Sequence, residues 1–169
     1  SIPAPGVHMI YSAAMAAAIG ERLGLTTEEI SRGVAQYAPT GERMRIEHLP
    51  GGRLMLNDSY NANPQSMGAG LRVLAATDCT KRIAMLGDMK ELGESSSEEH
   101  AKVVTMIGQC NFERVILVGE EFAKVDTAYE HYKDVEALKE VLSKEKPQGK
   151  YILIKGSNSM KLSGLKEVL

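Results

Sequence analysis

The chain has 169 residues, 43% hydrophobic and 25% charged, with 20 basic against 22 acidic side chains and a net charge of −2. This balance excludes a strongly basic nucleic-acid-binding surface, and the longest apolar stretch, residues 13–19, falls far short of the ~20 residues that span a bilayer. Two cysteines without CxxC spacing and four scattered histidines argue against a disulfide framework and a zinc site, so we expect a soluble α/β protein of a reducing compartment.

Residues 8–38 are predicted to form two helices. The alanine-rich run at residues 13–18 makes a slender first helix that can pack closely, and Gly24 suits its C-terminal end. Residues 26–29 (TTEE) have the spacing of a capping box. The second helix that they open has one apolar face, made by Ile30, Val34 and Tyr37.

Pro39-Thr40-Gly41 is predicted to end the second helix, to mark a domain boundary and to act as a hinge. Two helices with a thin alanine face cannot bury a core of their own. Residues 1–39 are therefore interpreted as the tail of a preceding domain.

After this boundary the spacing of the hydrophobic residues changes from one typical of helices to one typical of strands. Residues 44–48 and 54–56 are predicted to pair as a hairpin across the Gly51-Gly52 turn. Three further runs have the composition of buried strands: residues 83–86, 115–118 and 151–154.

Amphipathic helices are predicted to alternate with these strands. Each has a set of residues on one face: Val103, Ile107 and Cys110, then Val135, Leu138 and Leu142, then Leu162, Leu165 and Leu169. Nearly continuous apolar strands that alternate with helices indicate an open, mostly parallel α/β sheet with helices on both faces.

Ligands of such sheets bind beyond the carboxyl ends of the strands. Those ends are rich in glycine and polar residues here, at positions 57–60, 87–89, 119–120 and 155–157. Neither the dinucleotide fingerprint GxGxxG nor the phosphate loop GxxxxGK[ST] is present. By its own residues, this chain is not expected to hold and cleave a nucleoside triphosphate.

The run Asp58-Ser59-Tyr60-Asn61-Ala62-Asn63-Pro64, followed by Ser66-Met67, is similar to the signature of the Mur ligase family. The Asn-Ala-Asn-Pro version resembles the ligases that add D-alanyl-D-alanine to UDP-N-acetylmuramoyl tripeptide. Residues 86–93 (LGDMKELG) and 155–157 (KGS) match two further motifs, and Arg43 stands fifteen residues before Asp58, as a nucleotide-contacting arginine does in the family. Residues 6–18 resemble the last helix of the family's central ATPase domain.

The resemblance implies a C-terminal, Rossmann-like Mur ligase domain at residues 40–169, preceded at 1–39 by the helical tail of the ATPase domain. It implies an ATP-dependent ligase of the bacterial cytoplasm that acts through an acyl phosphate in peptidoglycan precursor synthesis. Its partners would be D-alanyl-D-alanine, UDP-N-acetylmuramoyl tripeptide and its own central and N-terminal domains. ATP and Mg²⁺ would be held mainly by the central domain, so this fragment would require neither and would be inactive alone.

The resemblance also implies roles for single residues. Arg43 and Asp58 would bind the nucleotide, as would Ser12, which stands where the family usually carries an asparagine near the adenine. The amides of Asn61 and Asn63 would orient groups at the reacting centre. Lys155, Gly156 and Ser157 would bind the carboxylate of the dipeptide at a helix start, and Asp88 and Glu91 its ammonium. No metal ligands are expected.

Each of these residues also has a purely structural interpretation. Asp58 could cap the helix that Pro64 opens, the two asparagines could be turn residues, and Ser157, Asp88 and Glu91 could cap helices. Arg43 could be a surface arginine. His100 is predicted to lie on the polar, solvated side of its helix. Two functional alternatives remain, another Mur-type amino-acid ligase and a non-catalytic binding module of the same fold.

Overall fold

The structure, a computed structural model, describes residues 5–6, 8–38 and 41–169. The chain divides into two compact units, Ser1–Thr40 and Gly41–Leu169. The predicted boundary residues Pro39 and Thr40 lie outside the described residues. Gly41 begins the second unit with a φ of 66°, a left-handed conformation that favours glycine.

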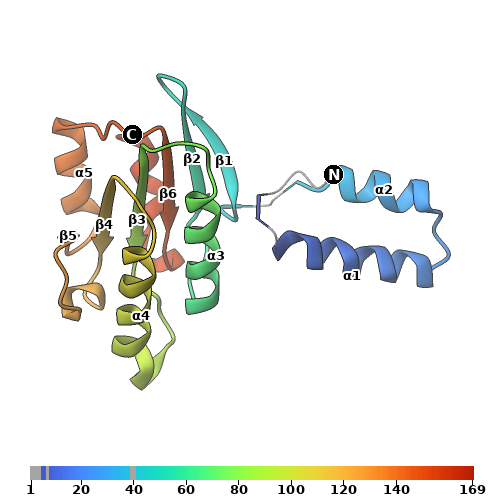
Figure 1. The fold of residues 1–169 in the computed structure, drawn as a ribbon, viewed down its shortest axis with the longest axis horizontal. Helices are drawn as coiled ribbons and strands as arrows, with labels where there is room; N and C mark the ends of the chain where they lie inside the picture. The colour runs from blue at the N-terminus through green and yellow to red at the C-terminus, as the bar shows by residue number, and fades with distance from the viewer. Residues whose placement is uncertain (1–4, 7, 39–40) are drawn as a thin grey trace. The chain divides into compact units, whose positions relative to one another are not determined.

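The first unit is a pair of helices, α1 (His8–Arg22) and α2 (Thr27–Ala35), as predicted (Figure 1). The predicted capping box is confirmed, because the Thr26 hydroxyl accepts from the Glu29 amide and the Glu29 carboxylate accepts from the Thr26 amide at 2.8 Å. Among the described residues of this unit, only Gly20 is buried. The large apolar side chains are exposed: Ile10, Tyr11, Met15, Ile19 and Leu23.

The second unit is built on a six-stranded sheet, which confirms the predicted fold class. Its strands are β1 (Arg45–Leu49), β2 (Arg53–Asp58), β3 (Arg82–Gly87), β4 (Arg114–Val118), β5 (Glu130–Tyr132) and β6 (Tyr151–Lys155). The spatial order is β1-β2-β6-β3-β4-β5, with β1 antiparallel to β2 and all other pairs parallel. The predicted hairpin turn is confirmed, with Gly51 and Gly52 both at positive φ. The short edge strand β5 has no buried residue, and the sequence patterns did not predict it.

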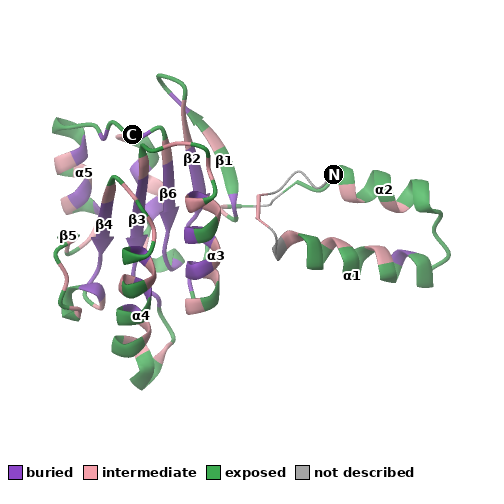
Figure 2. Ribbon diagram, in the orientation of Figure 1, coloured by how far each residue is buried: buried purple, intermediate pink, exposed green. Residues whose placement is uncertain are grey.

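Helices cover both faces of the sheet (Figures 1 and 2). On one face α3 (Pro64–Ala75) and α4 (Ser96–Gly108) bury Met67, Leu71, Leu74, Val103 and Ile107 against the sheet. On the other face α5 (Val135–Lys144) and the C-terminal segment bury Val135, Leu138, Leu142, Leu162 and Leu165. The central strands β3, β4 and β6 are consequently buried on both sides, as their apolar sequences indicate.

Two predicted helical features are wrong in detail. The C-terminal segment forms the 3-10 turns η3 (Asn158–Met160) and η4 (Leu162–Glu167) rather than a helix. Gly164 disfavours an α-helix there, while a 3-10 turn still brings Leu162 and Leu165, three residues apart, to one buried face. Cys110 lies beyond the end of α4 and is only partly buried. No helix in the described part of the chain is long and apolar enough to cross a membrane.

Candidate functional site

Polar side chains gather where the parallel strands end. In the register of the sheet, Asp58 at the end of β2 lies beside Lys155 at the end of β6, and Lys155 lies beside Leu86 near the end of β3. Gly87 pairs with Val118, the last residue of β4. The segments expected to carry chemistry therefore do reach one edge of the sheet.

Asp58 and Lys155 form a buried ion pair at this edge. The Lys155 Nζ lies 2.6 Å from Asp58 Oδ2 and 3.1 Å from the carbonyl oxygen of Asn61, and its side chain is 1% exposed. Asp58 Oδ1 accepts from the Met44 amide at 3.1 Å. Asp58 therefore binds its own chain through both oxygens, although 13% of its side chain stays exposed. It does not cap the following helix.

The structure corrects the expected geometry of Lys155-Gly156-Ser157. Lys155 is the last residue of a buried strand, where its ammonium compensates the Asp58 carboxylate, so it does not point outward at a helix start. The following turn, η3, has three residues and is too short to act as a helix N-terminus. At Gly156 a Cβ would lie 2.6 Å from Leu162 Cδ1 and 3.0 Å from Gly87 Cα, so close packing requires glycine.

The loop after Asp58 is held largely by its own side chains. The Asn61 side-chain oxygen accepts from the Ala62 amide at 2.8 Å. Asn63 is the N-cap of α3, since its Oδ1 accepts from the Ser66 amide at 2.8 Å while the Ser66 hydroxyl accepts from the Asn63 amide. These contacts match the structural interpretation of both asparagines, and their role at a reacting centre stays a prediction.

The cap at Asn63 is directly testable. Asn63→Ala should lower the free energy of unfolding by about 1 kcal/mol, because the Ser66 amide loses its acceptor. Asn63→Asp keeps the acceptor and should fold as stably as the parent. Chemical denaturation of the chain measures both. If Asn63→Ala has the same free energy of unfolding as the parent, the cap contributes nothing to stability.

Arg43 stacks on an aromatic ring beside this loop. Its guanidinium carbon lies 4.0 Å from the centroid of the Tyr60 ring, and both side chains are exposed. The stack is a cation–π contact that holds a planar cation at the surface. This placement leaves Arg43 free to contact a ligand, and its nucleotide role stays a prediction.

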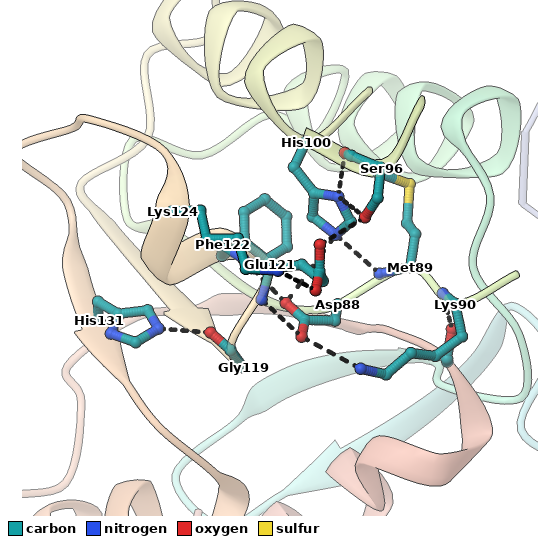
Figure 3. A network of polar contacts seen from close by, with 11 residues as sticks. Asp88, Met89, Lys90, Ser96, His100, Gly119, Glu121, Phe122, Lys124 and His131 are labelled. Atoms are coloured by element: carbon teal, nitrogen blue, oxygen red, sulfur yellow. Dashed lines mark hydrogen bonds and ion pairs between the residues drawn. The ribbon is translucent and has the colours of Figure 1, made fainter. Parts of the chain in front are cut away.

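A second polar network surrounds Asp88, just after β3 (Figure 3). The Asp88 side chain is fully buried, with Oδ1 accepting from the Phe122 amide and Oδ2 from the Glu121 amide, each at 3.0 Å. Asp88 thus holds the turn after β4 through both carboxylate oxygens, and its expected contact with a substrate ammonium stays a prediction. Glu91 is exposed and has a φ of 65°, an unusual conformation for a residue with a side chain.

His100 belongs to the same network, and the prediction that it is solvated is wrong. Its side chain is 0% exposed and packs edge-on against the Phe122 ring, with centroids 4.6 Å apart. Its Nε2 accepts from the Met89 amide at 3.0 Å. The sequence did carry the signal, because His100 lies three and seven residues before Val103 and Ile107, on their buried face of α4.

Glu121 is a site residue that the sequence patterns did not reveal. Its carboxylate accepts from Lys124 Nζ at 2.6 Å and from the Ser96 hydroxyl at 2.7 Å. Hydrogen bonds from Lys124 and Ser96 lower the pKa of Glu121 to about 2, so it stays ionised at any physiological pH. Glu121 thereby ties the turn after β4 to the start of α4.

A cleft of about 510 Å³ opens above Asp88, beyond the carboxyl ends of the strands. Charged side chains of both signs line it: Lys90, Lys133, Lys161, Glu120, Asp134 and Glu136. Such a lining is complementary to a small ligand that carries both an ammonium and a carboxylate. Neither Asp58 nor Lys155 is among the residues that line this cleft.

Ser12 lies in the first unit, exposed on α1. It lines a largely apolar hollow of about 290 Å³ between α1 and α2, together with Met9, Ala13, Ala16, Gly33, Val34 and Tyr37. The geometry places the Ser12 hydroxyl beside largely apolar side chains. A nucleotide contact there stays a prediction.

The residues present do not fit the polyphosphate of a nucleotide or a divalent cation. The sequence contains no phosphate-binding GxxxxGK[ST] loop. The described residues contain no group of three or more histidine, cysteine, aspartate or glutamate side chains that could hold a metal ion.

Comparison with known proteins gives a consistent picture. Residues 42–158 match the family described as Mur ligase, glutamate ligase domain. UDP-N-acetylmuramoyl-tripeptide–D-alanyl-D-alanine ligases of Treponema pallidum and Escherichia coli are 32% and 36% identical over 99% and 94% of the chain. A crystal structure of MurF from Acinetobacter baumannii superposes with a TM-score of 0.81 at 29% identity over 98% of the chain. The chain spans only 36–39% of the length of these relatives.

Proposed function

Because the chain belongs to the Mur ligase family, whose glutamate ligase domain it carries at residues 42–158, we propose that it is the C-terminal domain of a D-alanyl-D-alanine-adding ligase. The whole protein would join this dipeptide to UDP-N-acetylmuramoyl tripeptide at the expense of ATP, in bacterial peptidoglycan precursor synthesis. The similarity to two such ligases over nearly the whole chain supports this activity. Residues 1–39 would belong to the ATPase domain, in line with the exposed apolar side chains of α1.

The mixed-charge cleft is the observation that carries this proposal. A zwitterionic dipeptide needs one cation for its carboxylate and one anion for its ammonium, and the cleft offers both within about 510 Å³. Lys90 and Lys161 are the proposed carboxylate contacts, and Glu120 and Glu136 the proposed ammonium contacts. These exposed cleft residues are proposed in place of Lys155, whose ammonium is paired with Asp58, and of Asp88, whose buried carboxylate accepts from the Glu121 and Phe122 amides.

The nucleotide contacts remain part of the proposal. Arg43, stacked and exposed, and Asp58, with its small exposed fraction, are offered to the base or ribose of ATP, and Ser12 to the base. Asn61 and Asn63 would orient the reacting groups with their amide nitrogens, since their oxygens accept hydrogen bonds from the loop itself. Both asparagines would act by position and dipole, because an amide is no base near neutral pH.

The activity is tested with the full-length protein. ATP and UDP-N-acetylmuramoyl tripeptide are supplied with D-alanyl-D-alanine, D-alanine, D-glutamate or diaminopimelate, and products are identified by mass spectrometry. We expect turnover with the dipeptide alone, adding its mass less one water. Turnover with a single amino acid instead would identify another Mur-type ligase, and turnover with none would favour a binding module.

The 169-residue chain by itself should be inactive. No residue run in it can hold the β- and γ-phosphates of ATP, so phosphate release in the presence of all three substrates should match a protein-free blank. A colorimetric phosphate assay with the full-length protein as positive control measures this. Turnover by the 169-residue chain would contradict the assignment of the ATPase to other parts of the protein.

A further inference from the structure

The loop that follows β3 is tied to three different elements by three successive backbone amides. The Asp88 amide donates to the Val118 carbonyl at 3.1 Å, at the end of β4. The Met89 amide donates to His100 Nε2 at 3.0 Å, on α4. The Lys90 amide donates to the Ser157 hydroxyl oxygen at 2.9 Å, just after β6. Two of these three acceptors are side chains, so substitution can remove them without altering the loop itself.

The partners of His100 define its protonation state. Nε2 accepts a hydrogen bond from the Met89 amide and therefore carries no hydrogen, while Nδ1 lies 2.7 Å from the carbonyl oxygen of Ser96 and donates to it. His100 thus accepts through Nε2 and donates through Nδ1, and Figure 3 shows its ring between Met89 and Ser96. In this form it is the buried acceptor that the Met89 amide requires.

Lys90 is the residue that this anchoring presents to solvent. Its side chain is 46% exposed and lines the cleft, and its Nζ lies 3.4 Å from Asp88 Oδ2. Two adjacent backbone amides hold the loop at this point: the Met89 amide is bound by His100, and the Lys90 amide is bound by Ser157. The Ser157 amide in turn donates to the Asp88 carbonyl at 3.1 Å, which closes a reciprocal link between the two loops.

We propose that His100 and Ser157 are positioning residues that set the Lys90 ammonium at the mouth of the cleft, where it binds an anionic group of the substrate. His100 touches no ligand and acts only through the loop. The inference rests on the proposed function, because it assigns the carboxylate of the dipeptide to Lys90. On this proposal His100 does more than pack in the core, because its Nε2 holds the Met89 amide in place.

Two variants of His100 separate this task from packing. His100→Phe keeps the ring against Phe122 but removes the acceptor, whereas His100→Gln offers a side-chain oxygen near the former Nε2 position. In the full-length ligase, His100→Phe should raise the KM for D-alanyl-D-alanine about tenfold, as expected for a lost hydrogen bond that positions a charge, and leave the KM for ATP within about twofold. His100→Gln should recover most of the loss, and Ser157→Ala should resemble His100→Phe.

A double-variant cycle tests whether His100 acts through Lys90. Lys90→Met alone should raise the KM for the dipeptide, and adding His100→Phe to it should change that KM no further. Independent, multiplying effects would overturn the proposal. So would a His100→Phe variant in which the KM values for ATP and the dipeptide rise together, since that is the result of a merely structural role.

Nuclear magnetic resonance of the 169-residue chain tests the anchoring without any turnover. Long-range ¹H–¹⁵N spectra should show His100 with its proton on Nδ1, and the Met89 amide should exchange slowly in the parent and quickly in His100→Phe. A proton on Nε2 or an unprotected Met89 amide would refute the anchoring. A full-length parent that never uses the dipeptide, with the anchoring intact, would instead refute the proposed function.

Discussion

Replacing Lys155 by methionine is expected to lower the free energy of unfolding of the chain by about 3–5 kcal/mol. Methionine has nearly the same volume as lysine, so the expected loss of stability comes from removing the ammonium charge. The Asp58 carboxylate would stay at the strand end without the ammonium that now lies 2.6 Å away, and the Asn61 carbonyl would lose its donor. Urea denaturation followed by circular dichroism measures the difference.

Two further variants isolate the ion pair. Lys155→Met combined with Asp58→Asn removes both charges and should recover much of the lost stability, because no uncompensated ion remains. Lys150→Met makes the same substitution at an exposed lysine of the neighbouring segment and should change stability by less than about 0.5 kcal/mol. If Lys155→Met and Lys150→Met have the same free energy of unfolding, the ion pair between Lys155 and Asp58 does not stabilise the fold.

Gly119→Ala is expected to cost about 3 kcal/mol or more, the sum of a strained backbone and an overfilled site. Gly119 has a φ of 120°, and a Cβ there would lie 2.3 Å from the Asp88 carboxyl carbon. Either the turn after β4 or the Asp88 side chain must move, and the hydrogen bonds from Glu121 and Phe122 to Asp88 would break.

Gly108→Ala is the matched control for this substitution. Gly108 ends α4, where the nearest atom to an added Cβ is Tyr129 Oη at 3.8 Å, so alanine fits and should be neutral or stabilising by up to about 1 kcal/mol. Thermal unfolding of the two variants in parallel gives the comparison. If Gly119→Ala has the same melting temperature as the parent, the turn after β4 accommodates the added methyl group without loss of stability, and the position of Asp88 does not require glycine at residue 119.

The features predicted correctly from the sequence are those whose cause lies within a few residues. The Thr26 capping box, the Gly51-Gly52 hairpin and the apolar runs of the central strands each depend on neighbouring side chains and on the repeat of buried positions. The short edge strand β5 has no such pattern. It forms because the edge of β4 offers it hydrogen-bond partners, which is information held elsewhere in the chain.

The sequence by itself determined the buried strands of the sheet, the α-helices between them and the family signature at residues 58–64. Each of these features follows from a short pattern of residues that has a local physical cause, or from a defined sequence motif. Only the tertiary structure decided which charges are free to meet a ligand. Lys155 and Asp58 stand 97 residues apart, and they neutralise each other because β6 enters the sheet directly beside β2. His100 and Asp88 are likewise buried by α4 and by the turn after β4. A buried charge or polar group must find a partner, and strand order decides which partners are within reach.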